Sequence, residues 1–134
     1  MSPADCADTV TSVRRLLVVL TLAAGIVWPG PAWSHAYLVR SRPAARAAVA
    51  RAPERVQLWF NERLEPAYSR VSVWNGATQR VDAGDARVTE SEPTELSVSV
   101  PPLPAGAYTV KYRVLSVDGH LVESEFVFSV RGAP

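Results

Sequence analysis

Between residues 56 and 130, apolar side chains recur at every second position in short runs, and turn-forming residues separate the runs. A run of this kind puts its apolar side chains on one face of a β-strand, because successive strand residues point to opposite sides. The clearest runs are Leu96-Val98-Val100, Tyr108-Val110-Tyr112-Val114 and Phe126-Phe128-Val130. No long stretch after residue 34 has the period of an amphipathic helix. The pattern therefore predicts an all-β fold.

The apolar runs predict about seven strands joined by short turns. The expected strands cover residues 35–39, 56–61, 69–74, 78–81, 95–100, 108–117 and 122–130, and the loop between residues 82 and 93 has room for one short strand near Val88. Asn75-Gly76 predicts a two-residue hairpin turn. Residues 44–52, between two prolines, are expected to form a connecting loop with room for one helical turn. Short strands at this spacing are typical of an antiparallel β-sandwich of immunoglobulin-like type.

Residues 1–34 show the order of features found in a secretory signal peptide. Two arginines precede a nearly continuous apolar run over residues 16–28, and a Pro-Gly-Pro sequence follows it. Ala32 and Ser34 then supply small residues at the −3 and −1 positions of a cleavage site. The apolar run is short for a membrane span, which needs roughly 20 residues, so an uncleaved membrane anchor fits less well. The sequence predicts removal of this signal peptide and one mature domain of residues 35–134.

The composition of the mature domain excludes several classes of function. The only cysteine of the chain is Cys6, which lies in the predicted signal peptide, so no disulfide or thiol chemistry is expected. The formal net charge is +1, which gives no electrostatic basis for binding nucleic acid. The serine-hydrolase motif Gly-x-Ser-x-Gly is absent. Glu62 and Glu65 are expected in a solvated bend and do not identify a glycosidase pair.

The chain contains two histidines, His35 and His120. His35 becomes the first residue after the predicted cleavage, so it would offer both its α-amine and its ring to a metal ion. Asp118 lies two residues before His120, and residues i and i+2 of an extended segment point to the same side. Two imidazoles, one amine and one carboxylate form a suitable donor set for Cu(II). The alternatives are that Asp118-Gly119 is only a hairpin turn and that His120 is an ordinary strand residue.

Four segments resemble the CopC (YobA-like) copper resistance proteins. They are His35-Ala36-Tyr37-Leu38, Leu58-Trp59-Phe60-Asn61-Glu62, Pro66-Ala67-Tyr68-Ser69 and Tyr112-Arg113-Val114-Leu115-Ser116-Val117-Asp118-Gly119-His120. The resemblance covers essentially all of residues 35–134. Its most specific parts are the histidine at the mature start and the Ser-x-Asp-Gly-His element. It implies a periplasmic β-sandwich of cupredoxin-like or immunoglobulin-like type.

The resemblance also implies a Cu(II) site held by the amine and ring of His35 together with Asp118 and His120, and we expect one such site per chain. Glu62 takes the place of a glutamate that lies near the copper in some family members. Members with a Cu(I) site carry a methionine-rich segment, whereas the only methionine of this chain is Met1, so no Cu(I) site is expected. A CopD-type inner-membrane copper transporter would be a separate partner. The domain itself is expected to be a monomer.

Three functional interpretations remain open. The first, which we favour, is an exported, non-enzymatic Cu(II)-binding protein that sequesters or delivers copper in homeostasis or resistance. The second is a copper oxygenase, because a histidine brace also occurs in lytic polysaccharide monooxygenases. A carboxylate at the metal would hinder oxygen chemistry there and argues against this second interpretation. The third is an immunoglobulin-like interaction module whose histidines are incidental.

Overall fold

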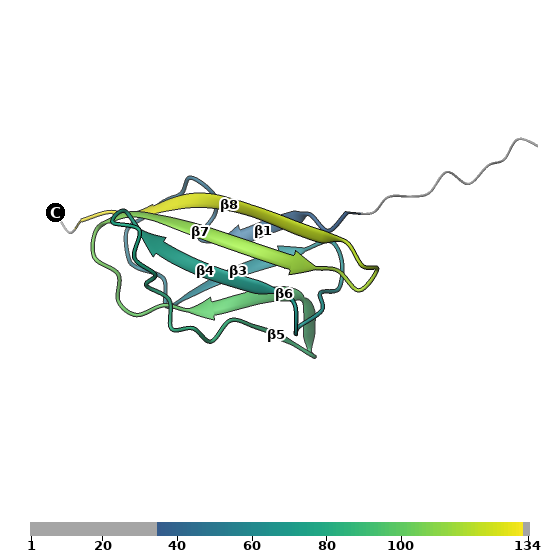
Figure 1. Cartoon of the computed structure of the whole chain (residues 1–134). Helices are drawn as coiled ribbons and strands as arrows, with labels where there is room; N and C mark the ends of the chain where they lie inside the picture. Colours follow the sequence, from purple (N-terminus) through teal and green to yellow (C-terminus); the bar gives the residue numbers. More distant parts are fainter. Residues whose placement is uncertain (1–34, 133–134) are drawn as a thin grey trace, which may run out of the picture. The chain divides into compact units, whose positions relative to one another are not determined.

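The computed structural model describes residues 35–132 and folds them into two stacked β-sheets (Figure 1). The strands, in chain order, are β1 (Leu38–Arg42), β2 (Ala48–Val49), β3 (Arg55–Phe60), β4 (Arg70–Asn75), β5 (Arg87–Thr89), β6 (Glu92–Ser99), β7 (Gly106–Leu115) and β8 (Leu121–Val130). The predicted signal peptide lies outside the described residues. Within residues 35–132, no helix is long and apolar enough to cross a membrane.

Each sheet contains four strands, ordered β1-β3-β6-β5 in one sheet and β2-β8-β7-β4 in the other. Neighbouring strands run antiparallel except for β2 and β8, which are parallel. The longest pair is β7 with β8, in register from Gly106 opposite Val130 to Leu115 opposite Leu121. The predicted antiparallel sandwich is therefore confirmed.

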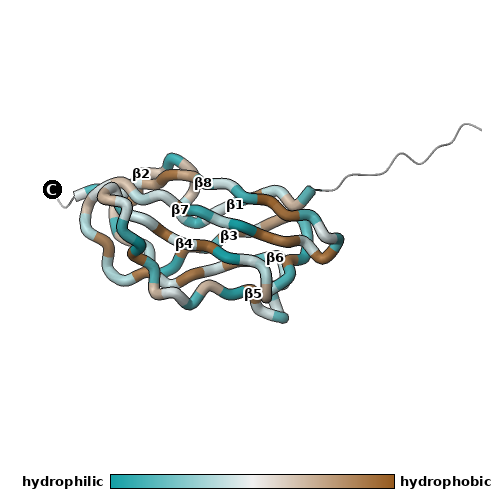
Figure 2. Tube along the Cα trace, viewed as in Figure 1, coloured by the Kyte–Doolittle hydropathy of each residue, from teal (hydrophilic) through white to brown (hydrophobic). Residues whose placement is uncertain are grey.

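The core lies between the sheets and uses the alternating positions of the sequence. Figure 2 shows apolar residues spaced along the strands. The side chains that are completely buried include Leu58, Val73, Leu96, Val110 and Val114. Residues Ser34–Pro134 form a compact unit of their own, and apolar burial is the main force that stabilises such a unit. We therefore expect the domain to fold without the residues that precede it.

Trp59 and Trp74 belong to the outer surfaces of the sheets, where they alternate with buried strand residues. Both side chains are half-buried. The guanidinium carbon of Arg40 lies 4.1 Å from the centre of the Trp59 ring, and the indole N–H of Trp74 donates a hydrogen bond to Ser72. These contacts account for both rings as parts of the sheet surface.

The chain reverses at Asn75-Gly76 as predicted, but the turn is wider than two residues. The returning segment bonds to β4 through the N–H of Asn75 to the Gln79 carbonyl at 2.9 Å and the N–H of Val81 to the Val73 carbonyl at 2.8 Å. It forms an isolated bridge, Trp74 opposite Arg80, and no regular strand. The side-chain oxygen of Asn75 accepts hydrogen bonds from the backbone N–H groups of Ala77 and Gln79, at 3.0 and 2.9 Å. Asparagine that bonds nearby backbone in this way closes a wider loop than a two-residue turn.

Two further local predictions differ from the structure. Residues 44–52 contain no helical turn, and they contribute the two-residue strand β2, which pairs with the C-terminal end of β8. β1 begins at Leu38 and not at His35. Propensity and pattern cannot locate either boundary, because both depend on contacts with a strand that is distant in sequence.

Candidate metal centre

The two histidines meet at one end of the sandwich, as the sequence predicts. Their ring centroids lie 5.0 Å apart, with an angle of 80° between the ring planes. His35 precedes β1 and His120 immediately precedes β8, and these strands belong to different sheets. The packing of one sheet on the other therefore creates the pair.

His120 is presented by the tight loop that joins β7 to β8. The N–H of Ser116 donates a hydrogen bond to the His120 carbonyl at 3.0 Å, and the N–H of Gly119 donates to the Ser116 carbonyl at 2.9 Å. Gly119 has a φ of 94°, a left-handed conformation that glycine adopts without steric cost. The loop is thus a three-residue turn closed by glycine, and not a two-residue Asp-Gly turn.

Asp118 and His120 meet because this turn folds them together, and not because the segment is extended. Asp118 Oδ2 lies 3.0 Å from His120 Nδ1. The hydroxyl of Ser116 donates a hydrogen bond to Asp118 Oδ1 and lies 3.3 Å from the backbone N–H of His120, which donates to it. Ser116 is completely buried. It belongs to the Ser-x-Asp-Gly-His element, but the sequence did not reveal this positioning role.

The environment of Asp118 favours its charged form. The hydrogen bond from Ser116 is the largest influence and lowers the pKa of the Asp118 carboxyl. Desolvation opposes this effect, and the contact with His120 lowers the pKa further. A carboxylate that stays ionised and touches an imidazole can bind a cation itself or orient the imidazole toward one.

The connector between β3 and β4 holds the β7–β8 loop in place. The N–H of Val117 donates a hydrogen bond to the Arg63 carbonyl at 3.0 Å, and the N–H of Glu65 donates to the Leu115 carbonyl at 2.8 Å. Both bonds join the connector to the same end of β7. The loop that carries Asp118 and His120 is therefore held both by its own hydrogen bonds and by those of the connector between β3 and β4.

The same connector holds His35 through Asn61. The Asn61 Oδ1 atom accepts a hydrogen bond from the Tyr37 N–H at 2.6 Å, and the Asn61 N–H donates to the Tyr37 carbonyl at 3.2 Å. Asn61 Nδ2 also donates to the His35 carbonyl at 3.4 Å. Ala36, between them, is buried in the core. The sequence signal for this role is an asparagine at a strand end, where its side chain can bond backbone groups.

The site is open to solvent, and the Asp118 carboxylate already contacts the His120 imidazole. The side chains of Asp118 and His120 are 40% and 38% exposed, and His35 is exposed. Within residues 35–132, no three His, Cys, Asp or Glu side chains form a metal-binding group as they stand. The donor types fit Cu(II), but a bound ion would have to draw these groups together.

Glu62 does not join this arrangement. It lies in the bend after β3 and is half-buried. Among the described residues, its side chain has no hydrogen bond or ion pair to another. Its place near a bound copper ion stays a prediction.

A model of the CopC domain matches residues 38–131, almost the whole of the described sandwich. The chain belongs to the CopC family. The protein YobA of Escherichia coli K12 is 34% identical to this chain, and the match covers 93% of this chain and 99% of YobA. Copper resistance protein C of Escherichia coli is 33% identical over 75% of this chain and 84% of its own length.

The solved structures agree with this assignment. The crystal structure of CopC from Methylosinus trichosporium OB3b matches with a TM-score of 0.70 and 39% identity, and covers 75% of this chain and 97% of that one. Its relatives include proteins named for copper resistance and for copper transport, so this chain belongs to a family of copper-handling proteins. The resemblance that its motifs indicated is confirmed.

Proposed function

We propose that this chain is an exported, non-enzymatic carrier that holds one Cu(II) ion per chain. The observation that carries the proposal is the meeting of His35 and His120, with Asp118 against the His120 ring, at a solvent-open end of the sandwich. After cleavage, the amine and ring of His35 would join these groups in a mostly nitrogen donor set, which suits Cu(II). The copper resistance of related proteins supports the same metal.

The donor set favours Cu(II) over Cu(I). Thiolate and thioether ligands select Cu(I), and residues 35–134 contain neither cysteine nor methionine. Reduction should therefore weaken copper retention sharply, so a Cu(I) chelator should remove copper more readily than a Cu(II) chelator of equal nominal strength. Equal competition by the two chelators would contradict this assignment of oxidation state.

Export to the periplasm follows from the predicted signal peptide. Mass spectrometry of exported protein should find a chain that begins at His35. Copper would then pass to or from a separate membrane transporter of CopD type.

The central experiment is a Cu(II) titration of residues 35–134, followed by spin resonance. We expect one tight site with a tetragonal, nitrogen-dominated signal. His120→Ala should remove tight binding, while its cooperative unfolding shows that the variant is folded. Copper should raise the melting temperature of the unsubstituted domain by mass action. Tight binding that survives His120→Ala would overturn the proposal.

The same titration tests Glu62. Glu62→Gln should weaken Cu(II) binding if its carboxylate approaches the metal, because the substitution removes a charge and keeps the shape. Glu65→Gln is the matched control, since Glu65 lies in the same connector and its backbone, not its side chain, holds Leu115. Equal affinities in the two variants would remove Glu62 from the site.

A further inference from the structure

The edge of β8 that faces away from β7 is paired along the C-terminal half of the strand and open along the N-terminal half. Beside its C-terminal half, the N–H of Arg46 donates a hydrogen bond to the Val127 carbonyl at 2.7 Å, and the N–H of Ser129 donates to the Ala47 carbonyl at 2.9 Å. These bonds tie β8 to β2 and to the turn before it. They also show that the odd-numbered residues of β8 direct their backbone polar groups away from β7.

The N-terminal half of β8 has the same outward-pointing groups but no neighbouring strand. By the same alternation, the N–H and C=O groups of Leu121, Glu123 and Glu125 point away from β7. No strand within residues 35–132 pairs with them, since β2 reaches only Ser129 and Val130. Residues 123–125 are all exposed in succession. An open strand edge of this kind can accept an added strand.

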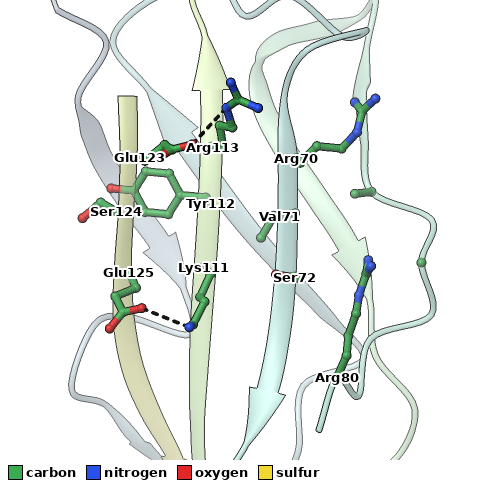
Figure 3. Close-up of a pocket in the computed structure, with 12 residues that line it drawn as sticks. Arg70, Val71, Ser72, Arg80, Lys111, Tyr112, Arg113, Glu123, Ser124 and Glu125 are labelled. Atoms are coloured by element: carbon green, nitrogen blue, oxygen red, sulfur yellow. Dashed lines mark ion pairs between the residues drawn. The ribbon is translucent and has the colours of Figure 1, made fainter. Parts of the chain in front are cut away.

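The outer face beside this edge carries two columns of opposite charge (Figure 3). On β7, Arg113 Nε lies 2.9 Å from Glu123 Oε1, and Lys111 Nζ lies 3.6 Å from Glu125 Oε2. The side chains of Glu123 and Glu125 are still 66% and 61% exposed. Each glutamate therefore has room for a second cation on the side away from β7. A strand added there would place alternate side chains next to these carboxylates.

A second copy of the same edge is a poor occupant. Antiparallel pairing of two β8 edges would bring the glutamates of one copy opposite those of the other. Like charges directly opposite each other across strands are destabilising. A strand with lysine or arginine at alternate positions would instead add a second column of cations. The glutamates of β8 would then lie between this column and the cations of β7.

We propose that the open edge of β8, from Leu121 to Glu125, binds an extended segment of another protein by strand addition. That protein exchanges copper with this chain, and its segment carries lysine or arginine at alternate positions. The edge starts at the residue after His120, so one end of the added strand would lie beside the metal centre. An edge this short gives a weak, reversible contact, which suits transfer of an ion. The exchange of copper rests on the proposed function, whereas the strand addition does not.

The test uses the metal-free domain, residues 35–134, and a short synthetic peptide in which lysine and valine alternate. We expect slower hydrogen exchange and shifted NMR signals at the amides of Leu121, Glu123 and Glu125. The amides of Val122 and Ser124 should be slow before the peptide is added, because they face β7. A peptide with glutamate in place of lysine should bind at least tenfold more weakly.

A third peptide separates strand addition from charge attraction. It keeps the lysines but has methylated backbone nitrogens along its pairing edge, so it cannot donate the hydrogen bonds of a ladder. This peptide should also bind at least tenfold more weakly than the original. Equal binding of the methylated and unmethylated peptides would overturn the proposal, as would the absence of protection at the three amides.

Charge reversal on the protein gives the complementary test. Glu123→Lys/Glu125→Lys should weaken binding of the lysine peptide at least tenfold and strengthen binding of the glutamate peptide. Glu90→Lys/Glu92→Lys is the matched control, and it should leave both affinities unchanged. Both glutamates are exposed; Glu90 lies in the turn after β5, and Glu92 is the first residue of β6. A dimer that protects the β8 amides without peptide would identify a second copy as the occupant and overturn the proposal. All measurements omit copper, so a failed Cu(II) titration would not affect them.

Discussion

The two halves of the candidate metal centre are built in different ways. The half with His120 is a closed turn in which a buried serine, Ser116, bonds Asp118 and the His120 backbone. The half with His35 is the start of the sandwich, held by the buried Ala36 and by the side chain of Asn61. Folding alone completes the first half. The α-amine that the second half would contribute exists only after cleavage before His35.

In the proposed carrier, metal binding is therefore coupled to export. A preorganised turn keeps its donors in place without further ordering when the ion binds, so it lowers the entropy cost of binding. An amine and a ring on one residue lower this cost in a second way, because chelation avoids gathering two separate ligands. The unprocessed chain would lack this second contribution, and it should bind copper weakly until it is exported.

The largest expected effect comes from extending the chain before His35. One added methionine turns the α-amine into an amide, a far poorer donor at neutral pH, and fills space that other ligands need. We expect Cu(II) affinity to fall about 100-fold or more, equal to roughly 3 kcal/mol, with unchanged cooperative unfolding of the apo domain. Competition titration against a Cu(II) chelator measures the loss. Equal affinity of extended and authentic chains would show that the N-terminal half contributes no amine.

The next effect in size comes from opening the preformed half with Ser116→Ala. Loss of the hydroxyl leaves the part-buried N–H of His120 without its partner, which costs about 1–3 kcal/mol of folding stability. It also removes a hydrogen bond to the exposed Asp118 carboxylate. Cu(II) affinity should fall about tenfold, and the pKa of Asp118 should rise toward its ordinary value. Chemical denaturation, copper competition and NMR titration report the three changes.

The matched control for this variant is Ser69→Ala. Ser69 is also buried, and its hydroxyl accepts a hydrogen bond from the Leu115 N–H at 3.3 Å, but it contacts neither Asp118 nor His120. It should lose comparable stability and keep its copper affinity and the pKa of Asp118. If both serine variants lose copper equally, general loosening of the fold and not the positioning of the ligands explains the effect.

The smallest effect comes from loosening the N-terminal half with Asn61→Ala. The substitution removes two side-chain hydrogen bonds at an exposed position, each worth about 1 kcal/mol or less. We expect Cu(II) affinity to fall a few-fold, while hydrogen exchange at Tyr37 becomes faster in the apo domain. Asn75→Ala is the control, because Asn75 also ends a strand and bonds its own loop, but at the other end of β7. Unchanged exchange at Tyr37 would mean that Ala36 alone anchors this segment.

The sequence allowed most of the fold to be predicted, because strand alternation is local. The runs around Leu96, Val110 and Phe128 occur where the structure has β6, β7 and β8. The loop at Asn75-Gly76 could not be predicted in the same way, since a side chain that bonds its own backbone competes with the turn that the pair favours. The three-residue length of the turn at Asp118 could not be predicted either, because hydrogen bonds around the buried Ser116 close it.

By itself, the sequence determined which residue types are available: two histidines, an acidic residue two positions from one of them, and no soft ligand after residue 34. These follow from chemistry that needs no coordinates. Three features appear only once the chain is folded: His35 lies against His120, Asn61 and Ser116 hold the two halves of the metal centre, and one half of β8 has an open edge. The physical reason is that each of these features joins segments from different strands or sheets, and no local pattern records which distant backbone group a side chain or strand edge will meet.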